Sequence, residues 1–298
     1  MMKFNQSLLI LFAVLMASSA VSAQDVSVDQ LKQMIENSTQ NLTTYSYSRH
    51  ADTNLLYTNA TIDRGFSAVK ITEGKVDLVN QTGYWDSNLA DRTSGQVLTW
   101  DGYLVNGTEY WKEGQNWTTS TRMNRSRLLE DYNEIPGEVN LIRYSNLTIV
   151  GSEMVAGEET YKLAGSPMGP IYRGMIGLQL LVAYIPSSFP LPEDIREGRL
   201  VLSRTGLMNN SNITLTAWIT KDNALLKRLD INSSLTVSPQ ILNISAPNYM
   251  ITSKINESTV YSDFGAPVNI ELPSVAQNQS GGVRAVDYRW SLFGSVRP

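Results

Sequence analysis

Residues 97–122 read VLTWDGYLVNGTEYWKEGQNWTTSTR, and this stretch decides the fold class. Three segments rich in β-branched and aromatic residues are separated by the pairs Asn106–Gly107 and Glu113–Gly114. An Asn-Gly pair between two such segments is a strong signal for a tight turn between antiparallel strands. The stretch therefore predicts three consecutive strands of a meander, with tryptophans and tyrosines on neighbouring strands.

The same strand pattern continues on both sides of this stretch. Before it, a turn at Glu73–Gly74 would pair residues 69–71 with residues 76–78. After it, Ala156–Gly157 joins two strands, and the apolar residues of Leu225–Val237 share the odd positions. The strands expected downstream are residues 147–154, 159–163, 200–204, 212–220, 224–237 and 249–263.

Three segments lack the two-residue period and are expected to be helical. Ser27 followed three residues later by Gln30 is a capping-box signature for a helix over residues 28–40. Residues 124–144 are expected to be helical on either side of their proline. Residues 169–192 contain a segment that is apolar nearly all round and is bounded by prolines. A helix of that kind is either buried or covers something apolar.

The first 23 residues have the order of a cleavable secretory signal peptide. Lys3 precedes the apolar run Leu8–Met16, and small residues follow as far as Ala23. The run is shorter than the ~20 residues that span a bilayer, which argues against the alternative of a retained anchor. We expect an exported protein, secreted or at the cell surface, with one domain over residues 24–276 and a flexible tail over residues 277–298.

Composition excludes several partners and chemistries. The chain is 42% hydrophobic and 17% charged, with a net charge of −4 and no basic stretch, so nucleic acid is not expected as a partner. It has no cysteine, which removes disulfides and thiolate sites. The longest apolar segment after the signal peptide, residues 171–185, contains Arg173 and is too short to cross a membrane. No transmembrane span is therefore expected in the mature chain.

The chain is rich in Asn-x-Ser/Thr triplets, the acceptor motif for N-glycosylation. In the alternating segment Leu225–Val237, Asn232 falls on the polar phase and is expected to point to water, as is Asn146 in its strand. The alternative is a polar β-surface that generates the triplets incidentally. The fourteen candidate acceptors are Asn37, Asn41, Asn59, Asn80, Asn106, Asn116, Asn124, Asn146, Asn209, Asn212, Asn232, Asn243, Asn256 and Asn278.

The order of these elements resembles the LolA-like superfamily, which includes the mycobacterial LppX/LprG-like lipid-binding lipoproteins. The resemblance covers most of residues 28–276 and indicates a secreted member of archaeal type. It rests on the order of individually weak pieces, none of which is a catalytic signature. These pieces are residues 74–84, Tyr103 to Trp111 with Trp117, Ala217 to Asp222, Tyr261 to Gly265, and Leu272–Pro273.

The resemblance implies an α+β fold with a large curved antiparallel sheet, a half-open β-barrel, whose concave face is covered by helices. The lipoproteins of this group are lipid-anchored, and this chain departs from them because it has no cysteine to modify. The concave face of a half-barrel must be filled either by side chains or by a ligand. The candidate ligand-binding residues, which could equally pack a core, are Trp85, Trp100, Tyr103, Trp111, Met175, Leu178, Leu181 and Val182.

The sequence offers little for catalysis. His50 is the only histidine, it lies in a polar stretch, and no Gly-x-Ser-x-Gly motif accompanies it. We therefore expect His50 to be a surface or loop residue, and we predict no catalytic residues, no cofactor and no metal site.

Two hypotheses for the function follow. The first is a secreted or cell-surface, non-enzymatic carrier for a lipid or other apolar molecule, held under the helix around residues 178–181. The alternative is a glycosylated structural or interaction module of the cell envelope, with an envelope protein as partner and a half-barrel filled by its own side chains.

Overall fold

The computed structural model describes residues 26–61, 63–114, 116–121, 133–184, 204–242, 248–274 and 276. The predicted signal peptide and C-terminal tail lie outside these residues. The described part of the chain contains the strands β1 (Thr44–Asn59), β2 (Asp63–Asp77), β3 (Thr82–Asp91), β4 (Val97–Val105), β5 (Thr108–Glu113), β6 (Asn116–Thr121), β7 (Ser145–Val155), β8 (Glu158–Pro167), β9 (Ser211–Thr220), β10 (Leu226–Val237) and β11 (Tyr249–Ser262).

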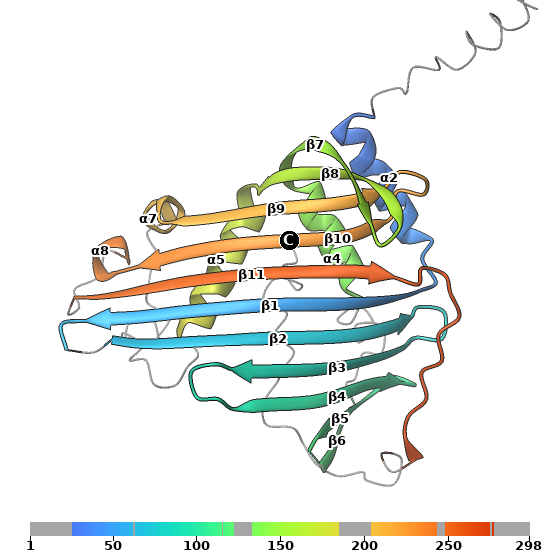
Figure 1. Ribbon diagram of the computed structural model, residues 1–298, viewed down its shortest axis with the longest axis horizontal. Coiled ribbons are helices and arrows are strands. Elements are labelled where there is room, and N and C mark those ends of the chain that lie inside the picture. The colour runs from blue at the N-terminus through green and yellow to red at the C-terminus, as the bar shows by residue number, and fades with distance from the viewer. Residues whose placement is uncertain are drawn as a thin grey trace, which may run out of the picture.

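All these strands belong to one 11-stranded sheet (Figure 1). Its order is β6-β5-β4-β3-β2-β1-β11-β10-β9-β8-β7, and every neighbouring pair is antiparallel. The first strand pairs with the last, from Ser46 opposite Ser262 to Asn59 opposite Tyr249. This central pairing joins the meander β1–β6 to the meander β7–β11 and leaves β6 and β7 as the two edges of an open sheet.

Helices cover one face of the sheet, which we call the concave face; the other is the convex face. The described helices are α2 (Val28–Gln40), α4 (Glu134–Arg143), α5 (Gly169–Tyr184), α7 (Arg204–Asn209) and α8 (Pro239–Leu242). Figure 1 shows α4 and α5 running behind the strands, and they pack mainly on β7, β8, β10 and β11. The predicted fold class, an α+β half-open barrel with helices on its concave face, is confirmed. No described helix is long and apolar enough to span a bilayer.

Local sequence signals account for many of the boundaries. The capping box at the start of α2 is present: the Ser27 hydroxyl accepts from the Gln30 backbone N–H at 3.2 Å, and the Gln30 side chain accepts from the Ser27 backbone N–H at 2.8 Å. Asn106 and Gly107 turn with positive φ values of 52° and 72°, as the Asn-Gly signal predicts. In β10 the odd positions from Leu229 to Val237 are buried and Asn232 is exposed, so the predicted phase is confirmed.

The turn predicted at Glu73–Gly74 is wrong, because both residues lie inside the continuous strand β2. The chain turns later, between β2 and β3, where Asp77 accepts hydrogen bonds from the backbone N–H groups of Val79 and Asn80. Gly74 has a different role. A Cβ atom at this position would lie 2.3 Å from the Tyr47 ring, so the missing side chain makes room for that ring.

The predictions for residues 124–144 and 200–204 are tested only in part, because some of these residues lie outside the described part of the chain. Helix α4 is continuous through Pro136, which occupies the first turn, where proline is tolerated. Residues 124–132 lie outside the described part of the chain, so a helix over them remains a prediction. Residues 200–203 of a predicted strand also lie outside it, and Arg204 begins α7 rather than ending a strand.

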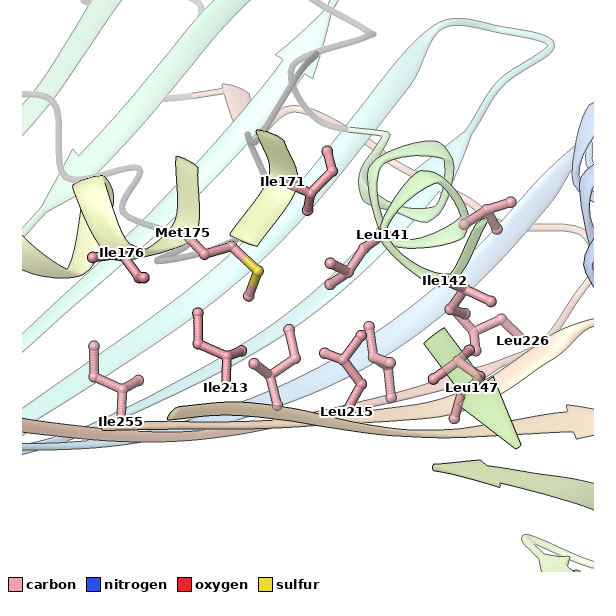
Figure 2. Close-up of a cluster of buried hydrophobic side chains, with 14 of the residues drawn as sticks. Leu141, Ile142, Leu147, Ile171, Met175, Ile176, Ile213, Leu215, Leu226 and Ile255 are labelled. Atoms are coloured by element: carbon pink, nitrogen blue, oxygen red, sulfur yellow. The ribbon is translucent and has the colours of Figure 1, made fainter. Parts of the chain in front are cut away.

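The main hydrophobic core lies between the helices and the strands β1 and β7–β11. Figure 2 shows Ile171, Met175 and Ile176 of α5 facing Ile213 and other side chains that rise from the sheet. Met175 and Ile213 are both 0% exposed. The concave face beneath this part of α5 is therefore filled by the protein's own side chains.

The contact between Gly74 and Tyr47 gives a test of the fold. Replacing Gly74 with Ala should lower the free energy of unfolding by about 1–3 kcal/mol, because the new methyl group overlaps a buried ring. Gly65→Ala in the same strand is the control, since its Cβ would meet only the Leu55 carbonyl oxygen at 3.8 Å. Urea denaturation measures both variants, and equal stabilities would contradict the assigned packing.

Candidate functional site

The concave face carries a second hydrophobic cluster, separate from the main core. We call it the tryptophan cluster: Trp85, Trp100, Trp111 and Leu104, with Leu89 half-buried against them. Its members come from β3, β4 and β5. The three indoles are buried, between 4% and 7% exposed. The described helices pack mainly on the other part of the sheet, so these strands form a distinct region of the concave face.

Glycines let the rings of this region lie against the sheet. In register, Tyr47, Gly74, Trp85, Gly102 and Trp111 form one row across β1–β5. A Cβ atom on Gly102 would lie 2.0 Å from Trp85 Nε1. The Trp85 and Trp111 ring centroids are 5.2 Å apart with an interplanar angle of 63°, an edge-to-face contact. The row alternates glycine with aromatic residues, which lines the concave face with indole rings.

The predicted ligand-binding residues divide between several places. Trp85, Trp100 and Trp111 come together in the tryptophan cluster, whereas Met175 lies in the main core. Leu178 is half-buried on α5. Leu181 and Val182 also belong to α5, but their side chains lie outside the description.

Tyr103 requires a correction, because it lies on the convex face. It alternates with Trp100, Gly102 and Leu104 along β4, which are buried on the concave side. Its ring instead contacts Tyr84, with centroids 4.8 Å apart, and Trp117, with centroids 5.9 Å apart. Tyr103 therefore does not belong to a site on the concave face.

A polar seam separates the two hydrophobic clusters. Thr259, Arg49, Thr72, Ser87 and Trp100 form one row across β11 and β1–β4 on the concave face. The hydroxyl groups of Thr72 and Ser87 hydrogen-bond to each other at 3.0 Å. The seam thus runs from the centre of the sheet to the edge of the tryptophan cluster.

Lys70 and Glu257 lie on the neighbouring row, on either side of Ala51. The Lys70 ammonium lies 5.5 Å from the centroid of the Trp100 ring, within cation–π range. The row connects the charged groups at the centre of the face directly to the tryptophan cluster.

Arg49 is the centre of the seam and contacts three carboxylates. Its Nη1 donates to Glu134 Oε1 at 2.8 Å, and its Nη2 donates to Glu138 Oε1 at 2.9 Å and is ion-paired with Glu134. Its Nε lies 3.3 Å from Glu257 Oε1 and donates to Thr259 Oγ1 at 3.0 Å. Two of the carboxylates come from α4 and the third from β11, so Arg49 ties the helix to the sheet.

The carboxylates outnumber the cations in this buried region, and the pKa values of Glu138, Glu257 and Lys70 are shifted. Burial raises the pKa of Glu138 to about 7, against the opposing attraction of Arg49. Burial also raises the pKa of Glu257. Burial lowers the pKa of Lys70 to about 8, with Arg49 acting in the same direction. Burial in this region thus favours the neutral forms of Glu138, Glu257 and Lys70.

The polar seam was not expected from the sequence, although the sequence carries a signal for it. Arg49 is in phase with the inward residues Tyr45 and Tyr47, and Glu257 is in phase with Ile255 and Tyr261. Charged residues on the apolar phase of a strand indicate a buried polar site. Their partners on α4 could not be paired with them from local patterns, because about 85 residues separate Arg49 from Glu134.

Other chemistry is sparse on the described surface. His50 lies on β1 and is exposed, which confirms the expectation of a surface residue. Within the described ranges, no group of three or more His, Asp or Glu side chains is arranged to hold a metal ion.

Most of the described acceptor asparagines are exposed to solvent. Asn124, Asn243 and Asn278 lie outside the described residues. Of the other eleven, ten are exposed and Asn59 is half-buried. Asn146, Asn212, Asn232 and Asn256 lie on the convex phase of their strands; the others lie on α2 or at the ends of strands and helices.

The raised pKa of Glu138 predicts a dependence of stability on pH. A carboxyl group whose pKa is higher in the folded than in the unfolded protein contributes stability below its unfolded value, and that contribution is lost as the pH rises through the folded value. From pH 4.5 to about pH 7, Glu138 should therefore reduce the free energy of unfolding by roughly 1–3 kcal/mol. Glu138→Gln should flatten this part of the stability profile.

Thermal unfolding between pH 4.5 and pH 8 measures the effect. Glu36→Gln is the control, because Glu36 forms an exposed ion pair with Arg143. A slope that is the same in wild type and Glu138→Gln would contradict the assignment.

No protein-family model and no curated protein matches the chain. Among solved structures it is similar to LprF from Mycobacterium bovis, at 16% identity and a TM-score of 0.42, over 83% of this chain and 96% of that one. It is similar to lipoprotein LppX from Mycobacterium tuberculosis, at 14% identity and a TM-score of 0.39, over 82% and 98% of the two chains. A LolA superfamily protein from Nitrosomonas europaea matches at 10% identity and a TM-score of 0.21, over 84% and 96%. The solved structures that this chain is similar to thus include the LppX and LolA groups that the sequence resembles.

Proposed function

We propose that this protein is an exported, non-enzymatic binding protein that holds a lipid or other apolar molecule on the concave face of its sheet, against the tryptophan cluster. One observation carries the proposal: the concave face has a second, aromatic cluster apart from the core that α4 and α5 cover. Indole rings laid over glycines form a smooth apolar floor of the kind that suits a hydrocarbon chain.

The binding region in this proposal differs from the one expected from sequence. The turns of α5 that carry Ile171, Met175 and Ile176 pack on the sheet as buried side chains, which disfavours a cavity directly beneath these turns. We therefore place the apolar part of the ligand beside Trp85, Trp100 and Trp111. An acyl chain of about 16 carbons gains ~0.8 kcal/mol for each buried CH₂, which is enough to offset the entropy lost on binding.

The second candidate is a glycosylated structural or interaction module of the cell envelope. Two observations favour it: the core beneath α5 is filled by side chains, and ten of the eleven described acceptor asparagines are exposed. Glycosylation is compatible with both candidates, because the described acceptors lie on the convex phase of strands, on α2 or at the ends of elements.

Ligand binding is tested on purified mature protein by native mass spectrometry with lipid extraction, followed by titration with a pyrene-labelled alkane. We expect a copurified apolar molecule and saturable binding. Trp111→Leu should weaken alkane binding about tenfold, because it removes ring area from the concave face. Trp117→Leu is the matched control, since Trp117 contacts Tyr103 on the convex face. If the protein copurifies with no apolar molecule and does not bind the alkane, the carrier function is ruled out and the envelope module is favoured.

Glycosylation is tested separately by intact-mass measurement of the protein secreted by its native host. Asn146→Gln should lower the mass by one glycan, because Asn146 is exposed on the convex phase of β7 and begins an acceptor triplet. Asn88→Gln is the control, since Asn88 is exposed on β3 but begins no triplet. A mass equal to that of the bare polypeptide would refute glycosylation.

A further inference from the structure

Six buried polar side chains on the concave side have atoms without a hydrogen-bond partner among the described residues. Three of these atoms, on Glu134, Glu138 and Tyr261, lie around the Arg49 guanidinium, which is ion-paired with both glutamates. The other three are Glu257 Oε2, Ser233 Oγ and Gln179 Oε1. The residues are 4%, 5% and 0% exposed. Buried polar groups are nearly always satisfied, so three in one region require an explanation. They are not explained by the main core, which is apolar around them.

The three residues lie close together in the fold. Ser233 is opposite Ile255, and Glu257 is opposite Ile231, so Ser233 and Glu257 are diagonal neighbours on β10 and β11. Ser253 is the next diagonal neighbour of Ser233. Gln179 reaches down from α5 and donates to Ser253, at 3.2 Å to its hydroxyl and 3.3 Å to its carbonyl oxygen. We call the group Gln179, Ser253, Ser233 and Glu257 the polar slot.

The polar slot continues into the tryptophan cluster. Glu257, Ala51, Lys70 and Leu89 follow one another along a single row of the sheet. Ala51 is the smallest of them, and Lys70 lies over the Trp100 ring. A molecule whose chain lies on the indoles would therefore bring its head to the slot across Ala51.

The chemistry of the slot selects the head group. Gln179 Oε1 only accepts hydrogen bonds, Glu257 Oε2 only accepts them when the carboxyl group is ionised, and the Ser233 hydroxyl can donate or accept. Arg49 is already in contact with three carboxylates and a threonine hydroxyl. When all of these groups are ionised, Glu134, Glu138 and Glu257 carry three negative charges and Arg49 and Lys70 carry two positive charges. The excess of negative charge disfavours a ligand with an anionic head group.

We propose that the polar slot binds the head group of an amphipathic ligand whose head is uncharged and carries hydroxyl groups, such as an acylglycerol or long-chain alcohol, in preference to a fatty acid or phosphate-bearing lipid. The inference rests on the proposed function and deepens it. The hydroxyl groups donate to Glu257 and Gln179 and exchange a hydrogen bond with Ser233, while the hydrocarbon lies on the tryptophan cluster.

The test compares three ligands of equal chain length on the mature protein: monolauroylglycerol, laurate and dodecane. We expect monolauroylglycerol to bind at least tenfold more tightly than laurate at pH 8. Dodecane should bind because it occupies only the tryptophan cluster. If none of the three binds, the proposed function fails as well; if dodecane binds and laurate matches or exceeds monolauroylglycerol, only the head-group assignment is overturned.

Ser233→Ala isolates the slot from the rest of the site. It should weaken monolauroylglycerol about three- to tenfold, leave dodecane unchanged, and keep the melting temperature at or above that of wild type, since it removes an unsatisfied buried hydroxyl. Ser46→Ala is the matched control, because the Ser46 hydroxyl is also without a partner among the described residues but lies on the convex phase of β1. Equal monolauroylglycerol affinities in Ser233→Ala and wild type would overturn the assignment.

Glu257→Gln tests the exclusion of anions. Removing one carboxylate should raise laurate affinity about tenfold relative to dodecane, whereas an unchanged ratio would count against the electrostatic part of the proposal. If this variant is unstable because Arg49 loses an ion-pair partner, the comparison of the three ligands on Ser233→Ala still decides the head-group assignment.

Discussion

The guanidinium group of Arg49 holds the centre of this protein together. It projects from the middle of β1 into the concave layer and contacts carboxylates from α4 and from β11, so it joins the first strand, the last strand and a helix. A buried ion pair adds little net stability, because desolvation offsets the attraction, but removing one partner leaves an uncompensated charge. The cluster therefore acts as a constraint on geometry: α4 must cross the sheet where Glu134 and Glu138 meet Arg49.

The position of α4 divides the concave face into two regions. On the side of β7–β11, the helices bring apolar side chains down onto the sheet, and the core is filled by residues such as Met175 and Ile142. On the other side, glycines in register with aromatic residues let the rings lie against the strands. The polar seam between them explains why the two apolar clusters do not merge. The concave face therefore combines a filled core with an aromatic floor, and both border on buried polar groups.

The two faces of the sheet also differ in what their surfaces can carry. A strand alternates its side chains between the faces, so one phase of each strand supplies the core and the other meets water. The acceptor asparagines Asn146, Asn212, Asn232 and Asn256 fall on the water phase of their strands, while Arg49, Lys70 and Glu257 fall on the inward phase. Charged residues on the inward phase are costly to bury, and the shifted pKa values of Glu138 and Lys70 reflect that cost.

The sequence by itself determined the features that depend on neighbours within a few residues. The capping box of α2, the turn at Asn106–Gly107, and the phase of β10 all follow from local hydrogen bonding, backbone sterics and side-chain alternation. The fold class implied by the resemblance to the LolA-like group, a large antiparallel sheet with helices on its concave face, is also confirmed. All three tryptophans proposed for the site came together because they share one phase of neighbouring strands.

Only the tertiary structure decided the rest, since it depends on contacts between residues far apart in the chain. The pairing of β1 with β11 brings Arg49 to Thr259 across 210 positions, and no local pattern specifies that partner. From sequence, Gly74 is typical of a turn, but in the sheet it makes room for the ring of Tyr47 on the neighbouring strand. Tyr103 lies among tryptophans in the sequence, but the alternation of the strand places it on the opposite face from Trp100. Neighbouring residues determine the alternation of side chains along a strand and the turn at its end. The packing of the whole sheet determines which strands pair and which charged residues come into contact.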